Sequence, residues 1–111
     1  MATGKDLRQK ALLLEGTTEA PHFDGAAFKV ARTYVTLAAN GLTANFKFTT
    51  DEQALKCLTA PDAFTPVPNA WGRQGWTAAT LAALSTAELT RALETAWRHA
   101  LPAPKKKARA R

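Results

Sequence analysis

The stretch AWGRQGWTAATL, residues 70–81, holds the side chains best suited to contact another molecule. It places Arg73 and Gln74 between two glycines, and each glycine permits the backbone angles of a tight connection. Arg73 and Gln74 would then lie at the tip of a hairpin, where a guanidinium can bind a phosphate or enter a narrow minor groove. Trp71 would be available to stack on a base. Trp76 begins the following strand and is expected to fill the core, as large aromatics usually do. An Arg73 that is merely solvated is the alternative.

The remaining reactive side chains do not match a catalytic or metal-binding pattern. His22 and His99 each lack a second ligand at zinc-binding spacing. Cys57 falls near the apolar face of a predicted helix, without a neighbouring base or cation that would favour the thiolate. We therefore predict no catalytic residue, no metal and no cofactor. An enzyme remains an alternative only if residues such as His22 and Asp24 lie in a cleft that the sequence does not reveal.

The net charge of +6 is concentrated at the carboxyl end of the chain. Residues 1–101 carry ten basic and nine acidic side chains, so this part is nearly neutral. Prolines 102 and 104 separate it from a basic tail, which we predict to be disordered over residues 102–111. The tail either binds phosphates or only increases solubility. Its basic residues are Lys105, Lys106, Lys107, Arg109 and Arg111.

Length and composition indicate one cytoplasmic domain. A chain of 111 residues suffices for a single core, which we place at residues 1–101. The single cysteine excludes an internal disulfide and agrees with a reducing compartment. Apolar runs such as ALLL, residues 11–14, are too short for a membrane span or a signal peptide. We therefore expect a soluble protein that has no membrane partner.

Three helices are predicted from hydroxyl side chains that can cap a first turn. In the second helix, Ala54, Leu55 and Leu58 are expected to face the core. The predicted helices cover residues 6–15 after Thr3, the segment from Thr50 (with Gln53 completing a capping box) to Pro61, and the segment from Ser85 (with Glu88) to Pro102.

The other segments have the two-residue period of strands. LTANFKFT, residues 42–49, alternates apolar and polar side chains, and Asn40-Gly41 before it predicts a type I′ hairpin turn. Further strands are predicted at 27–31, before Asn40, at the proline-containing edge segment 63–67, and at 75–81. The order α-β(3)-α-β(2)-α predicts an α+β two-layer sandwich, with an antiparallel sheet and helices on one face.

Several of these segments resemble the MmcQ/YjbR-like family. They are FKVARTYVTL at 28–37, DAFTPVP at 62–68, and GRQGWTAATL before a closing helix that contains ETAW. The resemblance extends over roughly residues 5–99. It implies an α-β(3)-α-β(2)-α fold like that of secretion chaperones, and DNA binding through a double-wing arrangement of hairpins. It implies no enzymatic activity, cofactor or catalytic residue.

These observations lead to two functional hypotheses. The first is a non-enzymatic protein that binds DNA weakly or without sequence preference. Arg73, Gln74 and Trp71 would contact DNA from one wing, the tail would add phosphate contacts, and further charge would come from Lys29, Arg32 and Lys47. The second is a protein- or peptide-binding module, monomeric or homodimeric, with no nucleic-acid role.

Overall fold

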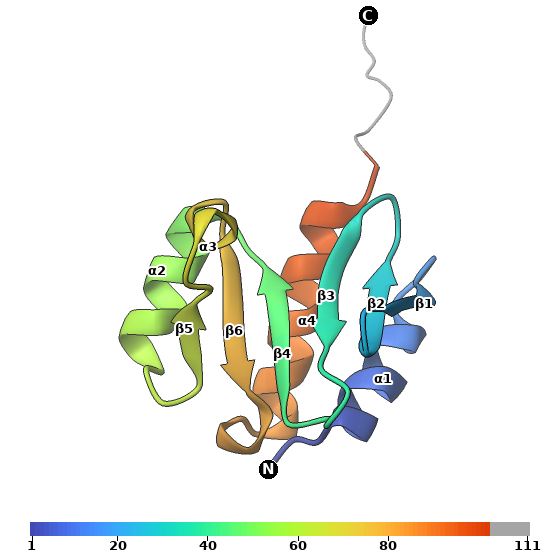
Figure 1. Cartoon of the computed structure of the whole chain (residues 1–111), viewed down its shortest axis with the longest axis horizontal. Helices are drawn as coiled ribbons and strands as arrows, with labels where there is room; N and C mark the ends of the chain where they lie inside the picture. The colour runs from blue at the N-terminus through green and yellow to red at the C-terminus, as the bar shows by residue number, and fades with distance from the viewer. Residues whose placement is uncertain (103–111) are drawn as a thin grey trace, which may run out of the picture.

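A computed structural model describes residues 1–102, which form an antiparallel sheet packed against a layer of helices (Figure 1). The strands lie in the order β1-β2-β3-β4-β6-β5, and each neighbouring pair is antiparallel. The predicted α+β two-layer sandwich is confirmed. In chain order the elements are α1 (Gly4–Leu13), β1 (Thr18–His22), β2 (Gly25–Lys29), β3 (Thr33–Leu37), β4 (Thr43–Lys47), α2 (Thr50–Thr59), β5 (Phe64–Pro66), α3 (Ala70–Arg73), β6 (Trp76–Thr80), the 3₁₀ turn η1 (Leu81–Ala83) and α4 (Thr86–Ala100).

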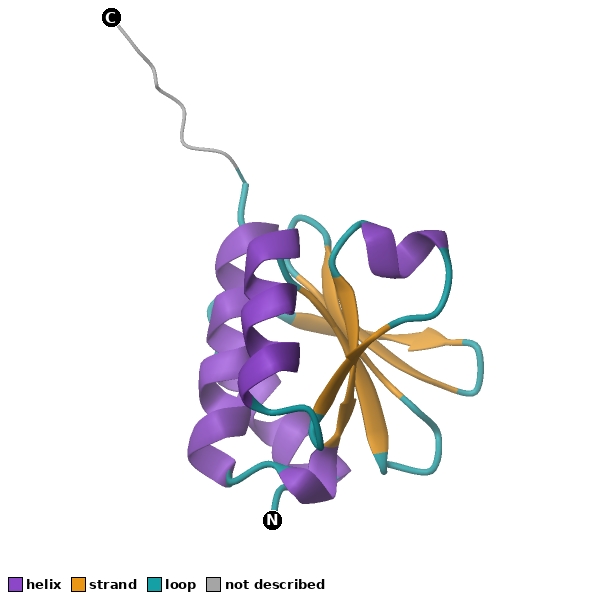
Figure 2. Ribbon diagram, turned by 90° about the vertical axis from the view of Figure 1, so that its left-hand side faces the viewer, coloured by secondary structure: helices purple, strands orange, loops and turns teal. Residues whose placement is uncertain are grey.

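Helices α1, α2 and α4 lie on one side of the sheet, and the short α3 lies on the other (Figure 2). The core fills the space between the sheet and the helical layer, where Phe28, Phe46 and Leu93 are almost completely buried. Within residues 1–102, no helix combines the length and apolar composition required to cross a lipid bilayer.

Three elements, β1, α3 and the 3₁₀ turn η1, were not predicted from the sequence. Strand β1 pairs only with β2, at the edge of the sheet, and most of its residues are exposed. A strand in that position needs no apolar alternation, and it tolerates Pro21 because one of its edges has no partner strand. The sheet therefore has six strands, where the sequence predicted five.

The caps of α1 and α4 form as predicted, whereas that of α2 lies one residue earlier. Thr49 accepts a hydrogen bond from the Glu52 backbone N–H (3.1 Å), and the Glu52 carboxylate accepts one from the Thr49 N–H (2.9 Å). Gln53 is therefore not part of the capping box that was predicted with Thr50. Its side-chain amide instead donates to two backbone carbonyls described below.

The prediction that Ala54, Leu55 and Leu58 face the core is wrong. All three are exposed, Leu55 by 61% and Leu58 by 78%. The opposite side of α2 faces the sheet, and the Lys56 ammonium lies 5.2 Å and 5.5 Å from the ring centroids of Phe48 and Phe64. The aliphatic stem of a lysine can cover aromatic surface, and its ammonium is attracted to the ring faces. Helix α2 therefore packs on the sheet through Lys56 and Cys57 rather than through its leucines.

The connection between β3 and β4 is not the predicted type I′ turn. Gly41 has a φ of +72°, but Asn40 does not have the positive φ that a type I′ turn requires of both central residues. The Gly41 N–H donates to the Ala38 carbonyl (2.9 Å), and the Asn40 side-chain oxygen accepts from the Leu42 N–H (2.9 Å). The connection is longer than a two-residue loop, so glycine alone adopts the left-handed conformation.

A β-bulge at Tyr34 determines which side chains of β2 and β3 point into the core near the connection between these strands. Phe28 lies opposite Val35, and Lys29 lies opposite Thr33, so Tyr34 is the extra residue. Its buried hydroxyl lies 2.8 Å from the Thr17 hydroxyl. The bulge lets Tyr34 and Val35 both enter the core while Lys29 remains exposed.

Candidate nucleic-acid interface

Strands β5 and β6 form the predicted hairpin, but the segment between them is not a tight tip. Residues 70–73 form one helical turn, α3, capped by the Asn69 side-chain oxygen, which accepts from the Trp71 N–H (2.8 Å). Arg73 ends this helical turn and Gln74 follows it. The prediction of a hairpin wing with Arg73 and Gln74 at its tip is therefore wrong, because the connection is long enough to coil.

Backbone crowding explains the two glycines of the GRQG segment. A Cβ on Gly72 would lie 1.8 Å from the Val67 carbonyl oxygen, and one on Gly75 would lie 1.9 Å from the Phe48 carbonyl oxygen. Gly75 also has a φ of +103°, whereas Gly72 does not have a positive φ. Both positions therefore need the absence of a side chain, and only Gly75 also needs the conformational freedom of glycine.

Helix α2 fixes the position of this segment through a single side chain. The Gln53 amide donates to the Gly72 carbonyl (2.9 Å) and to the Trp76 carbonyl (3.0 Å). These bonds join α2 to both ends of the turn that carries Arg73. The side chains of Arg73 and Gln74 are exposed, and within residues 1–102 Arg73 forms no salt bridge. Its guanidinium is thus available to an external anion.

The prediction that Trp76 belongs to the core is wrong. In β6 the inward positions are Thr77 and Ala79, so Trp76 points to the opposite face of the sheet and is only partly buried. The core accommodates Thr77 because its hydroxyl donates to the Gly75 carbonyl (2.9 Å). Trp76 lies opposite Lys47 in the β4–β6 register. Trp71 is also accessible, with an exposed fraction of 59%.

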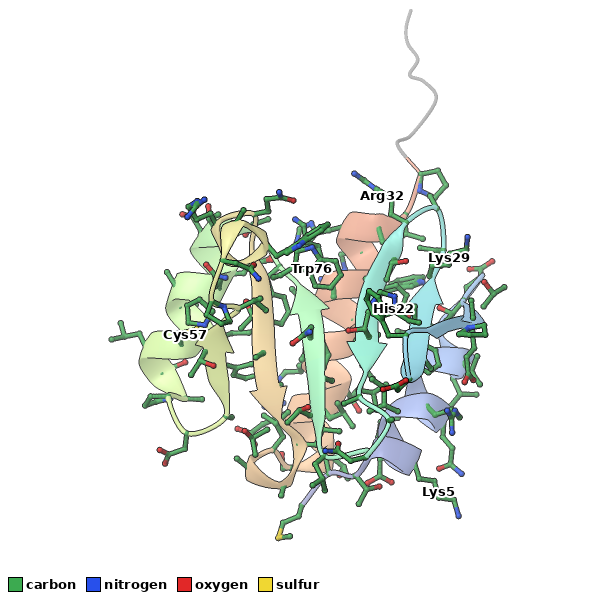
Figure 3. All side chains as sticks on the ribbon, in the orientation of Figure 1. Lys5, His22, Lys29, Arg32, Cys57 and Trp76 are labelled. Carbon is green, nitrogen blue, oxygen red and sulfur yellow. The ribbon has the colours of Figure 1, made fainter. Side chains whose placement is uncertain are left out.

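Four predicted basic residues lie at one end of the sheet, which we call the basic end. It is the end at which β2 and β4 finish and β3 and β6 begin. Lys29 ends β2, Lys47 ends β4, Arg32 lies in the β2–β3 connection, and Arg73 precedes β6. Figure 3 shows Lys29 and Arg32 near this end, together with Trp76.

The carboxyl end of α4 also reaches the basic end. The Arg32 guanidinium donates to the His99 carbonyl at 3.0 Å, which places the last turn of α4 beside the β2–β3 connection. The described chain finishes just beyond, at residue 102. The predicted tail residues Lys105, Lys106, Lys107, Arg109 and Arg111 lie outside the described residues.

A hydrogen bond to His99 engages one carboxylate at the basic end, that of Glu52. The His99 Nε2 atom lies 2.8 Å from the Glu52 carboxylate and joins α4 to the first turn of α2. Burial raises the pKa of Glu52, but hydrogen bonds from Thr49 and His99 outweigh burial and lower that pKa overall. Glu52 is therefore ionised and engaged within the protein, although Asp51 beside it remains exposed.

The residues considered for catalysis, His22, Asp24 and Cys57, do not lie together in one site. His22 and Asp24 both line a hollow in the sheet face, and no hydrogen bond joins them in the described part of the chain. Cys57 packs against the core, and burial raises the pKa of its thiol. In the same residues, 1–102, no group of three or more His, Cys, Asp or Glu side chains is placed to hold a metal ion.

The family follows from a match to residues 12–99, which fit the YjbR family model. The chain belongs to the YjbR family. This YjbR-family protein is also similar to a crystal structure of Deinococcus radiodurans protein DR2400, which carries the domain DUF419. The TM-score is 0.74 at 21% identity, over 86% of this chain and 76% of that one, so the likeness concerns the fold. No curated protein matches the chain.

Proposed function

We propose that this YjbR-family protein is a non-enzymatic DNA-binding protein that contacts phosphates through the basic end. The observation that carries the proposal is the convergence of Lys29, Arg32, Lys47 and Arg73, from separate segments, at the point where the chain continues into its basic tail. Cations spread over such a surface neutralise phosphates without reading bases. Binding of this kind is weak, independent of sequence and sensitive to salt.

The expected salt dependence is set by the number of phosphates that the protein neutralises. For B-DNA, the slope of log affinity against log salt changes by about −0.9 per neutralised phosphate. The five tail charges would therefore contribute a slope of about −4.5 if all of them bind phosphates. Each basic-end residue that neutralises a phosphate would add a further change of about −0.9 to this slope. The tail and the basic end can thus be separated by the slope that each one removes.

The test is a titration of a labelled duplex at several salt concentrations, followed by fluorescence anisotropy. It compares the full chain with Lys47→Ala/Arg73→Ala and with a full-length variant whose five basic tail residues are replaced by serine. Lys5→Ala is the matched control, because Lys5 is an exposed lysine at the opposite end of the molecule (Figure 3). The basic-end and tail variants should each weaken binding and make the affinity less dependent on salt, so that the slope is less negative. Lys5→Ala should change neither the affinity nor the slope. If the tail variant loses all binding while Lys47→Ala/Arg73→Ala binds like the wild type, the basic end is not the contact.

The second candidate function is binding to another protein, and the exposed Leu55 and Leu58 of α2 favour it. Both leucines lie on a helix that packs through its opposite side, so they are available to a partner such as a second copy of this chain. Sedimentation of the wild type and of Leu55→Ser/Leu58→Ser tests this function. A dimer that dissociates in the variant, together with no duplex binding by the wild type, would favour it over DNA binding.

A further inference from the structure

The sheet has an outer face, turned away from α1, α2 and α4, that no described element covers completely. Its central row consists of short side chains, so the backbone of the strands lies close to the surface. Register places these residues side by side across all six strands: Ala20, Ala27, Thr36, Asn45, Ala78 and Thr65. Two residues further along β4 and β6, the next row contains Lys47 and Trp76. This row connects the outer face to the basic end.

The charge of the outer face complements a polyanion. Its charged strand residues are Lys29 and Lys47. The six described strands contain one acidic residue, Glu19, which lies opposite the core residue Phe28 and therefore points to the other face. There it pairs with Arg8 of α1 at 3.0 Å. A phosphate chain that crosses the outer face would thus meet the two lysines at the basic end, whereas a carboxylate, that of Asp24 in the β1–β2 turn, lines the hollow at the opposite end.

Aromatic rings lie near both ends of the outer face. Trp76 is at the basic end, and Phe23 occupies the β1–β2 turn at the other end. Phe23 is 95% exposed and has a φ of +54°, a conformation that a bulky L-residue seldom adopts. Backbone strain of this kind is typical of functional positions. Here it holds in solvent a ring that contributes almost nothing to the core.

The face is hollowed at its Phe23 end, between the β1–β2 turn and the β3–β4 connection. A hollow of about 520 Å³ is lined by the β1–β2 turn and by Thr36 and Asn45 of the central row. The ring of His22 contacts the ring of Phe23 with centroids 4.7 Å apart. Figure 3 shows His22 and Trp76 over the sheet face opposite α4. The hollow therefore combines an aromatic wall with the Asn45 amide, which can both donate and accept hydrogen bonds, and with the Asp24 carboxylate, which can accept them.

We propose that the outer face binds unpaired bases, so that the preferred ligand is single-stranded DNA. This inference rests on the proposed function, because the basic end would hold the phosphates of the same strand. Trp76 and Phe23 stack on bases, and the Asn45 amide hydrogen-bonds to a base edge in the hollow. A duplex keeps its bases stacked and paired, so it cannot offer their faces to these rings. Ala27 of the central row is buried, but the short side chains of Thr36, Asn45 and Ala78 are partly exposed and leave room for a base to lie against the sheet.

The experiment measures the affinity of the full chain for a labelled oligothymidylate and for a labelled duplex of the same length, at the same salt concentration. The variants are Phe23→Ala, Trp76→Thr and the conservative Trp76→Phe. Leu13→Ala is the matched control, because Leu13 is an apolar side chain, 84% exposed, on α1 in the helical layer. Thermal unfolding of each variant establishes that it is folded.

We expect the oligothymidylate to bind more tightly than the duplex. Phe23→Ala and Trp76→Thr should each weaken its binding by about 5- to 150-fold, the range found for loss of one base–aromatic stack. Trp76→Phe and Leu13→Ala should bind nearly as the wild type does. Because Phe23 is almost fully exposed, its replacement should leave the fold intact. The duplex affinity should be unaffected by all four substitutions.

Different results overturn the inference and the proposed function. If both probes bind equally and the aromatic variants bind like the wild type, while Lys47→Ala/Arg73→Ala weakens binding, the stacking surface is wrong and the phosphate contact stands. If Lys47→Ala/Arg73→Ala changes neither affinity, the proposed function fails. The absence of binding to either probe at low salt would overturn both.

Discussion

Replacing Phe23 with glycine should stabilise the protein, although it removes a large apolar side chain. An L-residue in the left-handed region is disfavoured by about 1–2 kcal/mol, and Phe23 has a φ of +54°. Glycine avoids this penalty but makes the unfolded chain more flexible, which costs about 0.5–1 kcal/mol. The ring is 95% exposed, so its loss sacrifices little burial. The free energy of unfolding should therefore rise by about 0.5–1 kcal/mol.

Urea and thermal unfolding measure this difference. A gain of that size should raise the Tm by about 4 °C in a domain of roughly 100 residues. Phe23→Ala is the control, because alanine also lacks the ring but keeps the penalty of an L-residue at positive φ. A glycine variant no more stable than the alanine variant would refute the assignment of strain to this turn. If the turn also binds bases, the glycine variant should be more stable than the wild type and bind the oligothymidylate less tightly.

Two further predictions concern the contacts that hold the basic end. Gly75→Ala should lower the free energy of unfolding by about 3 kcal/mol, because it combines strain with a collision at the Phe48 carbonyl. Gly16→Ala is the control, because Gly16 has a φ of +80° but a Cβ there would make only an ordinary contact at 3.5 Å, so the free energy of unfolding should fall by about 1 kcal/mol. Both variants are compared by urea unfolding. Equal losses would contradict the crowding at Gly75. In the wild type, the folded Glu52 pKa lies below its ordinary value of 4.5, so its stabilising contribution is present above that value and is lost as the pH falls below it. Glu52→Gln should remove this part of the pH dependence, measured as urea midpoints over a pH series, and an unchanged profile would argue against a role for the Glu52–His99 pair.

The sequence correctly predicted elements that depend on hydrogen bonds between neighbouring residues, and strands whose two faces differ clearly in polarity. Thr3 and Ser85 cap α1 and α4 as expected, because a capping box depends only on neighbouring residues. The alternation in β4 predicted its inward positions, Ala44 and Phe46. The prolines of segment 63–67 predicted the edge position of β5, and the following segment was correctly predicted to be its partner strand. These features depend little on the rest of the fold.

Features decided by tertiary contacts could not be predicted in the same way. In β6 both alternating sets contain alanine and threonine, and the expectation that a tryptophan must be buried selected the wrong set, with Trp76 inward. The side of α2 that carries Gln53 and Lys56 faces the sheet because these side chains find carbonyls and rings there, which no periodicity reveals. The helical turn α3 depends on the approach of Gly72 to the Val67 carbonyl.

The candidate site was partly predictable. Lys29, Arg32, Lys47 and Arg73 were selected for their charge, and their common location follows from antiparallel pairing, because alternate strand ends meet at one edge. Phe23 was not among the residues predicted to bind a ligand. Its signal is the HFDG segment, in which an aromatic occupies a turn position that usually favours glycine or asparagine.

Helix α2 contains no fully buried residue, and its contacts with the rest of the protein include the Gln53 amide and the Glu52–His99 pair. A segment attached in this way separates from its neighbours at a lower free energy than the core helix α4, which buries Leu89 and Leu93. Its separation would leave the carbonyls of Gly72 and Trp76 without the amide that holds them. The placement of the arginine at the end of α3 therefore depends on a peripheral helix, and substitutions far from any ligand can change binding by loosening that helix.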